Sequence, residues 1–470
     1  MKTDSGSGGA RVAADSEADQ KLRRGLGLTD CILLVVGSMV GSGIFLTNAH
    51  IASALSSPLL ILVAWLLGGV MALTGALTYA ELGASLPRAG GHYVYLREAY
   101  GPLVGFLDGW LSFVASFPGS IAFVALGLLA YLPGAWSGDP MFSIRLLGME
   151  WAVGRSQLIA IGVILGLSLV NALGLRAGSR FQNFLTVLKI AALAGIAAFG
   201  LTSGRGQWSH FTALVPVTSV TLAGLGAALI GVSFSYLGWD AATYMAAETR
   251  DPQRNIPRSL ALGTTMVVGL YMLFNIGLFY GLAAPEVAAA GSPTEAAVAR
   301  LLGSGFTGLV SATIFICIIG SLNATIMVGP RIYYAMARDG LFPRSLGSVS
   351  SVTRVPTAAI AAQAIWSCVI VLSATLGRIL AFTVLVIWLL SAVTGAAVFL
   401  LRRRRPDLPR PYRAWGYPVI PALFCLSSLA LTINHLRNTP SDLLWLAGFL
   451  AAGVPVYACL RRKARMSEAV

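Results

Sequence analysis

Three features of the sequence place residue types that could bind a charged ligand inside otherwise apolar stretches. Gly41-Ser42-Gly43 interrupts one stretch, Ser233–Asp240 interrupts another, and Lys189 puts an ammonium group inside a third. Glycine has no β-carbon and tolerates non-helical dihedrals, so a helix can unwind at Gly41–Gly43 where other residues would resist. The spacing therefore predicts a helix that is broken in its middle, with polar backbone groups left free at the break.

An unwound segment offers backbone groups of two kinds. Amides are exposed at the start of Ile44–Leu46, where the positive end of the following half-helix also favours a carboxylate. Carbonyl oxygens are exposed at the end of Val36–Val40, and these suit an ammonium group. Because an α-amino acid carries both charges, the break predicts a binding site for a zwitterion. The competing interpretation is that Gly37 and Gly41, four residues apart, only let another helix pack closely.

The second interrupted stretch carries an ionisable side chain. Asp240 inside an apolar segment costs roughly 3 kcal/mol at the bilayer centre unless it has a partner. We expect its carboxylate to be a structural cap for the half-helix that restarts at Ala241. Phe234 and Tyr236 could cover a ligand as a gate, whereas Trp239 is expected to be structural. Interruptions in corresponding stretches of both halves favour a midplane binding site over packing alone.

Lys189 lies well inside an apolar stretch, where a charge needs a partner or a function. It could be a fixed cation that contacts the unwound carbonyls of the first stretch, in place of a bound sodium ion. It could instead carry a proton, because burial favours the neutral amine. The third interpretation is that its long stem reaches the membrane surface near Arg180. A functional role is favoured, and the two functional versions stay open.

The composition places the whole chain in a membrane. Of 470 residues, 56% are hydrophobic and only 11% are charged, which is too little charge to cover a soluble surface. The net charge of +14 does not predict nucleic-acid binding, because the basic residues lie in short connections between apolar stretches. The 5 cysteines and 4 histidines show no metal-ligand spacing, so neither a metal nor a cofactor is expected. No cysteine is suited to bridging a covalent accessory subunit.

Apolar windows, read against glycine, proline and charge, predict about twelve membrane spans and an all-α fold. The predicted spans are 28–55, 58–84, 102–132, 155–174, 181–202, 220–248, 257–283, 306–336, 356–376, 379–401, 416–435 and 440–460. Short surface helices are expected within 86–100 and 285–303. Residues 1–27 are expected to form a disordered cytoplasmic tail and residues 461–470 a second tail.

Lysine and arginine are distributed unevenly between the two sets of connections. If the N-terminus is cytoplasmic, the inner connections carry an excess of about four to one over the outer ones. This bias predicts that both termini face the cytoplasm of a multi-pass protein in the cell membrane. It also predicts an even number of spans.

Spans 1–5 (28–202) and spans 6–10 (220–401) are similar in length, and 416–460 holds the last two. An odd number of spans in each unit forces the second unit to be inverted, which is how many transporters build a central site. The two interrupted stretches begin these units, so the sequence predicts a 5+5 inverted repeat with broken helices 1 and 6.

Carboxylates near the predicted site bear on the kind of ligand. Glu81 and Glu248 end spans beside basic connections, so we expect salt bridges to Arg88, Arg250 or Arg254. No carboxylate lies in the middle of spans 3, 8 or 10. A cationic side chain would need such an anion, so neutral ligands fit better.

Five motifs resemble the amino acid–polyamine–organocation superfamily, and within it most closely the L-type (heteromeric-type) amino-acid transporters and their bacterial relatives. The resemblance runs from Leu26 to about Leu460. Its carriers are Gly41–Phe45, Tyr79–Tyr93 (YAELGASLPRAGGHY), Ala247–Pro257 (AETRDPQRNIP), Gly320–Ala324 together with Ala335–Pro343, and Pro406–Tyr412.

The resemblance implies a leucine-transporter-type fold and a role for individual residues. Substrate carboxylate would meet the backbone at Gly41, Ser42, Gly43 and Ile44. The amino group would meet carbonyls of Met39, Phe234, Ser235 and Leu237. Phe234 would be the aromatic gate, Lys189 would take the place of a sodium site, and Asn323 would be a polar residue near the site.

The resemblance implies a secondary transporter of small to medium neutral L-amino acids that works by alternating access. Exchange for a second amino acid and symport with a proton both remain open. The chain departs from the L-type pattern at Leu237, where a glycine is usual and where the cationic-transporter branch is more similar. A permease for cationic amino acids or polyamines is therefore the alternative. An enzyme is not expected, because no nucleophile–base pair, metal cluster or nucleotide-binding motif is present, and a channel filter is equally lacking.

Overall fold

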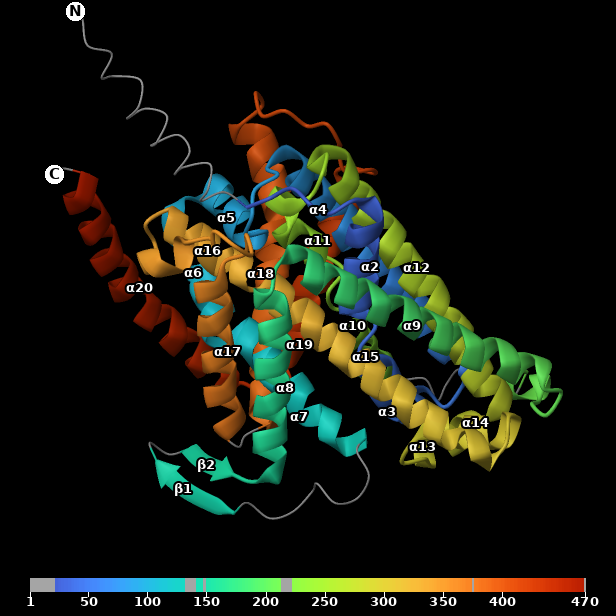
Figure 1. Cartoon of the computed structure of the whole chain (residues 1–470). Helices are drawn as coiled ribbons and strands as arrows, with labels where there is room; N and C mark the ends of the chain where they lie inside the picture. Colours follow the sequence, from blue (N-terminus) through green and yellow to red (C-terminus); the bar gives the residue numbers. More distant parts are fainter. Residues whose placement is uncertain (1–21, 132–140, 147–148, 213–221, 374–375, 469–470) are drawn as a thin grey trace, which may run out of the picture.

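Long helices form most of the chain and run between the two ends of one bundle, in the computed structural model of the protein (Figure 1). The structure describes residues 22–131, 141–146, 149–212, 222–373 and 376–468. The helices of the first half are α2 (Leu28–Met39), α3 (Gly43–Leu55), α4 (Pro58–Ser85), α5 (His92–Tyr100), α6 (Pro102–Leu111), α7 (Phe117–Gly127), α8 (Arg155–Ala172) and α9 (Leu175–Thr202). A π-helical turn, Ser112–Ser116, joins α6 to α7.

The second half repeats the pattern of long helices with short ones between them. Its helices are α10 (Leu222–Ser235), α11 (Ala241–Tyr244), α12 (Pro252–Gly281), α13 (Ala284–Ala289), α14 (Pro293–Leu301), α15 (Thr307–Val328), α16 (Pro330–Arg338), α17 (Thr357–Leu372), α18 (Leu376–Arg404), α19 (Val419–Asn438) and α20 (Ser441–Glu468). The short helices α5, α13 and α14 lie within the connections where surface helices are predicted.

Local sequence explains where several helices begin. Pro58, Pro102 and Pro252 occupy the first turn of α4, α6 and α12, where a missing backbone N–H costs nothing. Gly101 has a φ of 99°, a conformation that other residues rarely adopt, and it turns the chain from α5 into α6. The proline and glycine positions therefore separate the surface helix from the span that follows it.

Nine helices among the described residues are long and apolar enough to cross a membrane. A tenth span results when α2 and α3, which are bent by 43° at their break, are counted together. Two shorter apolar helices, Gly224–Ser235 and Thr357–Leu372, lie within two further predicted spans. The multi-pass character is thus confirmed, whereas the total of about twelve spans and the inverted repeat stay predictions.

Three details differ from the sequence-based expectations. The predicted all-α fold class is confirmed, but an antiparallel hairpin of β1 (Phe142–Leu146) and β2 (Met149–Val153), which was not predicted, lies in the connection before α8. The tail predicted for 1–27 does not extend to its last residues: the amides of Gly25 and Leu26 donate to the carbonyl of Glu248, and Leu26 is buried. At the other terminus α20 continues through the predicted second tail as far as Glu468. Residues 1–21 lie outside the described residues.

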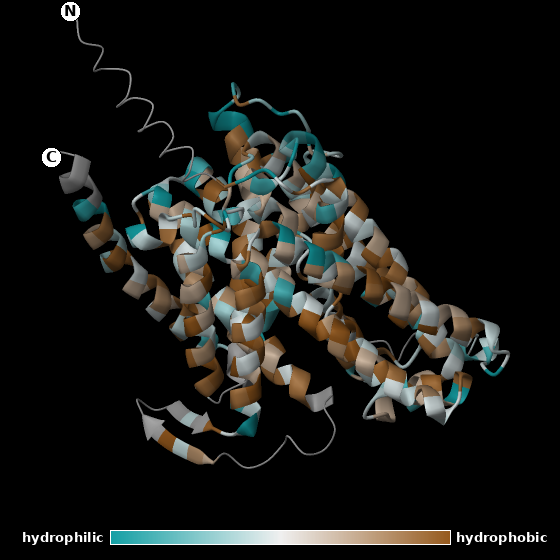
Figure 2. Cartoon of the chain, viewed as in Figure 1, coloured by the Kyte–Doolittle hydropathy of each residue, from teal (hydrophilic) through white to brown (hydrophobic). Residues whose placement is uncertain are grey.

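Hydrophilic residues gather at the end of the bundle that carries α5 and α16, whereas the bodies of the helices are mostly apolar (Figure 2). Glu81 and Glu248 form salt bridges near this end, but not with the nearby arginines that were predicted. Glu81 binds Arg402 of α18 through two hydrogen bonds of 2.8 and 2.6 Å. Glu248 binds Arg331 of α16 at 2.8 and 3.0 Å. The predicted partners were wrong because sequence proximity does not show which helices pack together.

Helix contacts bring the two interrupted segments to the centre of the bundle. α2 packs against α9, α12 and α15, and α3 packs against α10. The short helix α11 contacts α2, so the second break lies beside the first. The fold therefore surrounds both breaks with α9, α12 and α15, which supply the side chains that support them.

Candidate functional site

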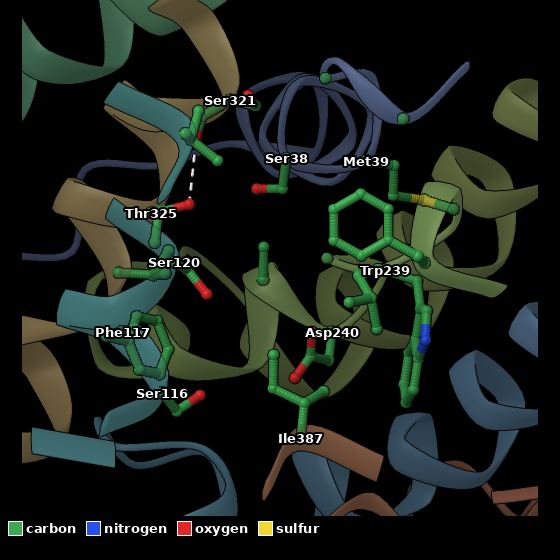
Figure 3. A pocket seen from close by; sticks show the side chains of 18 of the residues that line it. Ser38, Met39, Ser116, Phe117, Ser120, Trp239, Asp240, Ser321, Thr325 and Ile387 are labelled. Carbon is green, nitrogen blue, oxygen red and sulfur yellow. Dashed lines mark hydrogen bonds between the residues drawn. The ribbon is translucent and has the colours of Figure 1, made fainter. Parts of the chain in front are cut away.

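A cavity of about 180 Å³ lies between the two breaks. Its walls come from the α2–α3 break, from the start of α5, from the π-helical turn and α7, from the α10–α11 break, and from α15 and α18 (Figure 3). The predicted site residues that line it are Met39, Gly41, Ser42, Gly43, Phe234, Ser235 and Leu237. The structure thus brings both predicted breaks to a single cavity.

The first break runs from the end of α2 at Met39 to the start of α3 at Gly43. The backbone hydrogen bonds of α3 begin with the amides of Phe45 and Leu46, which donate to the carbonyl of Ser42. The amides of Gly43 and Ile44 precede these bonds at the positive end of the helix. This end therefore leaves donors free beside the cavity, which Gly43 lines and Ile44 does not; anion binding there stays a prediction.

Lys189 lies behind the first break and is completely buried. Its ammonium group donates hydrogen bonds of 2.8 Å to the carbonyl oxygens of Gly37 and Val40. These are carbonyls of the last turn of α2 and of the residue after it, where the helical pattern stops. The side chain therefore does not reach a membrane surface, and its nitrogen contacts the unwound carbonyls; its role as a fixed cation or as a proton carrier stays a prediction.

Tyr271 of α12 is a residue of the site that has no distinguishing mark in the sequence. Its hydroxyl lies 2.9 Å from the carbonyl oxygen of Met39 and 3.1 Å from that of Ser235. One side chain thus links the first break to the second. Both carbonyls were predicted to meet a ligand ammonium. The carbonyl of Ser235 keeps one lone pair for that role, whereas the carbonyl of Met39 also accepts a hydrogen bond of 3.0 Å from the amide of Gly41.

The second break runs from Ser235 to Ala241. Gly238 has a φ of 102° and approaches the first break so closely that a β-carbon would lie 2.9 Å from Cβ of Ser38. Gly43 approaches Ser235 in the same way, at 2.8 Å from its Cα. The two breaks therefore touch through glycines, and no larger residue fits at Gly238.

The glycines of α2 also serve packing, as the competing interpretation proposes. A β-carbon on Gly37 would lie 2.2 Å from Nε2 of Gln182 and 2.3 Å from the hydroxyl of Thr186, both on α9. A β-carbon on Gly41 would lie 3.0 Å from the hydroxyl oxygen of Ser321 on α15. Close helix packing and backbone unwinding thus occur in the same segment.

Asp240 occupies the N-cap position of α11, but its side chain makes no capping hydrogen bond, so the predicted cap is wrong. Its Oδ2 atom lies 2.9 Å from Nε2 of His92 and accepts a hydrogen bond of 2.9 Å from the hydroxyl of Tyr244. The carboxylate is therefore partnered across the site by α5 rather than by the amides of its own short helix.

Two other predicted site residues lie away from the cavity. Asn323 is fully buried in a chain of amides, where it accepts a hydrogen bond from Asn171 and donates one to Gln182. Tyr236 packs against Trp65 and Tyr271, on the side of α10 that faces α4. Neither side chain is placed to contact a ligand or to act as a gate, whereas Phe234 lines the cavity beside Phe123.

Hydroxyl groups that the sequence-based interpretation missed line much of the cavity. Ser112, Ser116 and Ser120 recur every fourth residue and share one face of the α6–α7 span. Ser321 and Thr325 do the same on α15. Figure 3 shows Ser116, Ser120, Ser321 and Thr325 around the same hollow. Serine at intervals of four in apolar spans is the signal that could have found them.

Ser38 lines the cavity from the first break, and its buried hydroxyl has no hydrogen-bond partner among the described residues. A buried hydroxyl without a partner costs free energy unless a ligand or water binds it. Within the same part of the chain, no group of three or more histidine, cysteine or carboxylate side chains could hold a metal ion. The polar groups of the cavity are thus backbone amides, carbonyls and hydroxyls, together with the imidazole of His92 and the carboxylate of Asp240.

Comparison with known proteins agrees with this geometry. The amino acid permease family matches residues 26–454. The serine/threonine exchanger SteT of Bacillus subtilis (strain 168) is 31% identical over 450 residues, which are 95% of this chain and 98% of the relative. The human b(0,+)-type amino acid transporter 1 is 27% identical over 93% of this chain and 88% of its own length. The human large neutral amino acids transporter small subunit 2 is 27% identical over 97% of this chain and 82% of its own length.

Proposed function

The chain belongs to the amino acid permease family, and we propose that it exchanges small neutral L-amino acids across the cell membrane. It is a multi-pass membrane protein and a transporter, not an enzyme. The observation that carries the proposal is the cavity between two touching helix breaks, one of which presents free amides and both of which present carbonyls.

The breaks suit the two charges of an amino acid. The α-carboxylate would accept a hydrogen bond from the amide of Gly43, which lines the cavity at the start of α3. The ammonium group would donate to the carbonyl oxygen of Ser235, which the hydroxyl of Tyr271 already holds in place. Lys189 would stabilise the carbonyls of the first break from behind without touching the substrate.

The other walls of the cavity favour a small side chain with a hydroxyl group. The volume of about 180 Å³ is comparable to the roughly 150 Å³ of a cavity that binds benzene, so a large side chain does not fit this conformation. Ser38, Ser116 and Ser120 offer hydroxyls to a polar substituent. The relative SteT is named a serine/threonine exchanger, which agrees with this choice.

We infer an orientation with both termini in the cytoplasm. Figure 1 places the first described residues and the last turns of α20 at the same end of the bundle. The excess of lysine and arginine in the connections at that end supports this orientation. The cavity would then alternate between the two sides as one group of helices moves against the other.

A permease for cationic amino acids or polyamines is the second candidate, because Asp240 contributes a carboxylate to the cavity. Its Oδ2 atom already has His92 and Tyr244 as hydrogen-bond partners. A cationic substrate would have to compete with both. This arrangement favours neutral substrates.

Uptake by proteoliposomes tests the proposal. We expect labelled serine, threonine and alanine to enter vesicles that are preloaded with unlabelled serine, and arginine and putrescine to be excluded. Uptake into vesicles without internal amino acid, driven by an acidic exterior, would indicate symport with protons instead of exchange. Preferential uptake of arginine or putrescine would favour the second candidate, and uptake of none of these compounds would contradict the proposal.

A further inference from the structure

His92, at the start of α5, lies between two carboxylates that come from different helices. Its Nε2 atom is 2.9 Å from Oδ2 of Asp240, and its Nδ1 atom is 4.0 Å from Oδ1 of Asp108 on α6. The side chain of Asp108 is completely buried, and neither of its oxygens has a hydrogen-bond partner among the described residues. An ionised carboxylate in this position is costly, so the arrangement requires something positive beside it.

The donor and acceptor roles of the imidazole define what is missing. Nε2 faces a carboxylate and must donate, which leaves Nδ1 of a neutral ring as an acceptor. An acceptor then faces the ionised carboxylate of Asp108 with nothing between them. One additional proton, carried either by Nδ1 or by the carboxyl of Asp108, removes this conflict. The three side chains are therefore arranged around a proton that the groups can bind and release.

A metal ion does not fit in place of this proton. The two carboxylates lie on opposite nitrogens of one ring, so no single point is ligated by all three groups. No metal-binding group was found among the described residues. Two aromatic side chains also contact His92: Tyr244 stacks on the ring at 5.4 Å, and Tyr79 of α4 meets it edge-on at 5.0 Å.

The charges around His92 favour its protonated form. Burial lowers the pKa of His92, but the hydrogen bond with Asp240 and the negative charges of Asp240 and Asp108 raise it by more, so the pKa lies above its usual value. A raised histidine pKa means that the proton is bound at acidic pH and is lost as the pH rises through that pKa.

This cluster is joined to the substrate cavity through the second break. Asp240 follows Leu237, Gly238 and Trp239, which line the cavity, and His92 and Asp240 line it as well. The start of α5 packs closely against α11, because a β-carbon on Gly91 would lie 2.6 Å from the ring of Tyr244. A displacement of Asp240 with the second break would break its 2.9 Å contact with His92.

We propose that Asp108, His92 and Asp240 form a proton-binding site whose occupancy is linked to amino-acid binding. The bound proton holds α5, α6 and α11 together and so fixes the second break in the form that binds substrate. Loss of the proton leaves two carboxylates against a neutral ring and releases α11. The proposal rests on the proposed function and adds the proton as a second ligand.

Calorimetry of serine binding to the purified full-length protein tests this site. In buffers with different ionisation enthalpies, wild-type protein should take up protons as serine binds. Its Kd for serine should rise with pH, by up to about tenfold per pH unit where the cluster titrates. Asp108→Asn and His92→Gln should bind serine without proton uptake and with a flat pH profile.

His435→Gln is the matched control, because His435 and Asp442 form another pair at 2.9 Å, outside the cavity. It should keep the wild-type proton uptake. Serine binding without proton uptake in the wild type, or with unchanged proton uptake in both cluster variants, would overturn the site while leaving the proposed function intact. A wild-type dependence on sodium rather than on pH would also overturn it. Absence of any amino-acid binding would contradict the proposed function, and the proton site would be rejected with it.

Discussion

Lys189 donates a hydrogen bond of 2.8 Å to the carbonyl oxygen of Val40, although 149 residues separate the two in the sequence. A second bond of the same length joins Lys189 to Gly37. The unwinding between α2 and α3 removes the amides that would pair with such carbonyls in a continuous helix. The ammonium group replaces them, so α9 supports the break from outside it.

Replacing Lys189 with methionine should reduce serine exchange by about tenfold or more, since each buried carbonyl left without a partner costs roughly 1–3 kcal/mol. The initial rate of uptake into proteoliposomes measures this effect, and thermal unfolding in detergent checks that the variant folds. Arg180→Met, at an exposed position of the same helix, should exchange serine at the wild-type rate. Normal exchange by Lys189→Met would mean that the break does not need this cation.

Tyr271→Phe should weaken serine binding, because the hydroxyl that joins Met39 to Ser235 is lost. Loss of a buried hydrogen bond costs about 1 kcal/mol, which corresponds to a several-fold rise in Kd. Tyr236→Phe is the matched control. The ring centroid of Tyr236 lies 5.1 Å from that of Tyr271, and its buried hydroxyl has no hydrogen-bond partner among the described residues. Equal Kd values for the two variants would show that the link between the breaks is unimportant.

Gly238→Ala should destabilise the protein and reduce its transport rate. A left-handed backbone costs an alanine about 1–2 kcal/mol, and the new β-carbon would lie 3.0 Å from the carbonyl carbon of Ser38. Thermal unfolding and serine uptake measure the two effects. Gly269→Ala introduces the same methyl group into open space on α12 and should change neither quantity. If both alanine variants behave alike, the contact between the two breaks is not tight in the working protein.

Arg331→Met should lower the free energy of unfolding by about 3–5 kcal/mol, because it leaves the buried carboxylate of Glu248 without its cation. Chemical denaturation in detergent measures the change. Arg88→Met removes an arginine from an ion pair with Glu98 in which the arginine side chain is 59% exposed, so its effect should be under 1 kcal/mol. A small effect of Arg331→Met would indicate that water reaches Glu248.

Ser116→Ala combined with Ser120→Ala should reduce the preference for serine over alanine by several-fold, because a substrate hydroxyl would lose its partners in the cavity. Competition of unlabelled serine and alanine against labelled substrate measures the preference. Ser53→Ala, at an exposed position of α3, serves as the control. An unchanged preference would place the substrate side chain against another wall.

The sequence by itself determined the membrane class, the ends of most helices and the two interrupted segments. The length of an apolar stretch and the presence of helix-breaking residues are local properties. Gly41–Gly43 and Gly238 therefore indicate where the helices unwind, whatever the arrangement of the helices in the bundle. It also singled out Lys189, because a lone ammonium in an apolar stretch must find a partner. The motifs identified the family before any geometry was considered.

Only the tertiary structure decided which side chains meet. Asp240 turns to His92 instead of capping α11, Asn323 joins a buried amide chain, and Tyr271 links both breaks. Glu248 pairs with Arg331 rather than with the arginine two residues away. These contacts join segments far apart in the chain. Hydrophobic burial drives the helices together, but it is non-directional and does not determine which polar side chains pair. Partner choice follows from the packing of whole helices, which no local pattern in the sequence encodes.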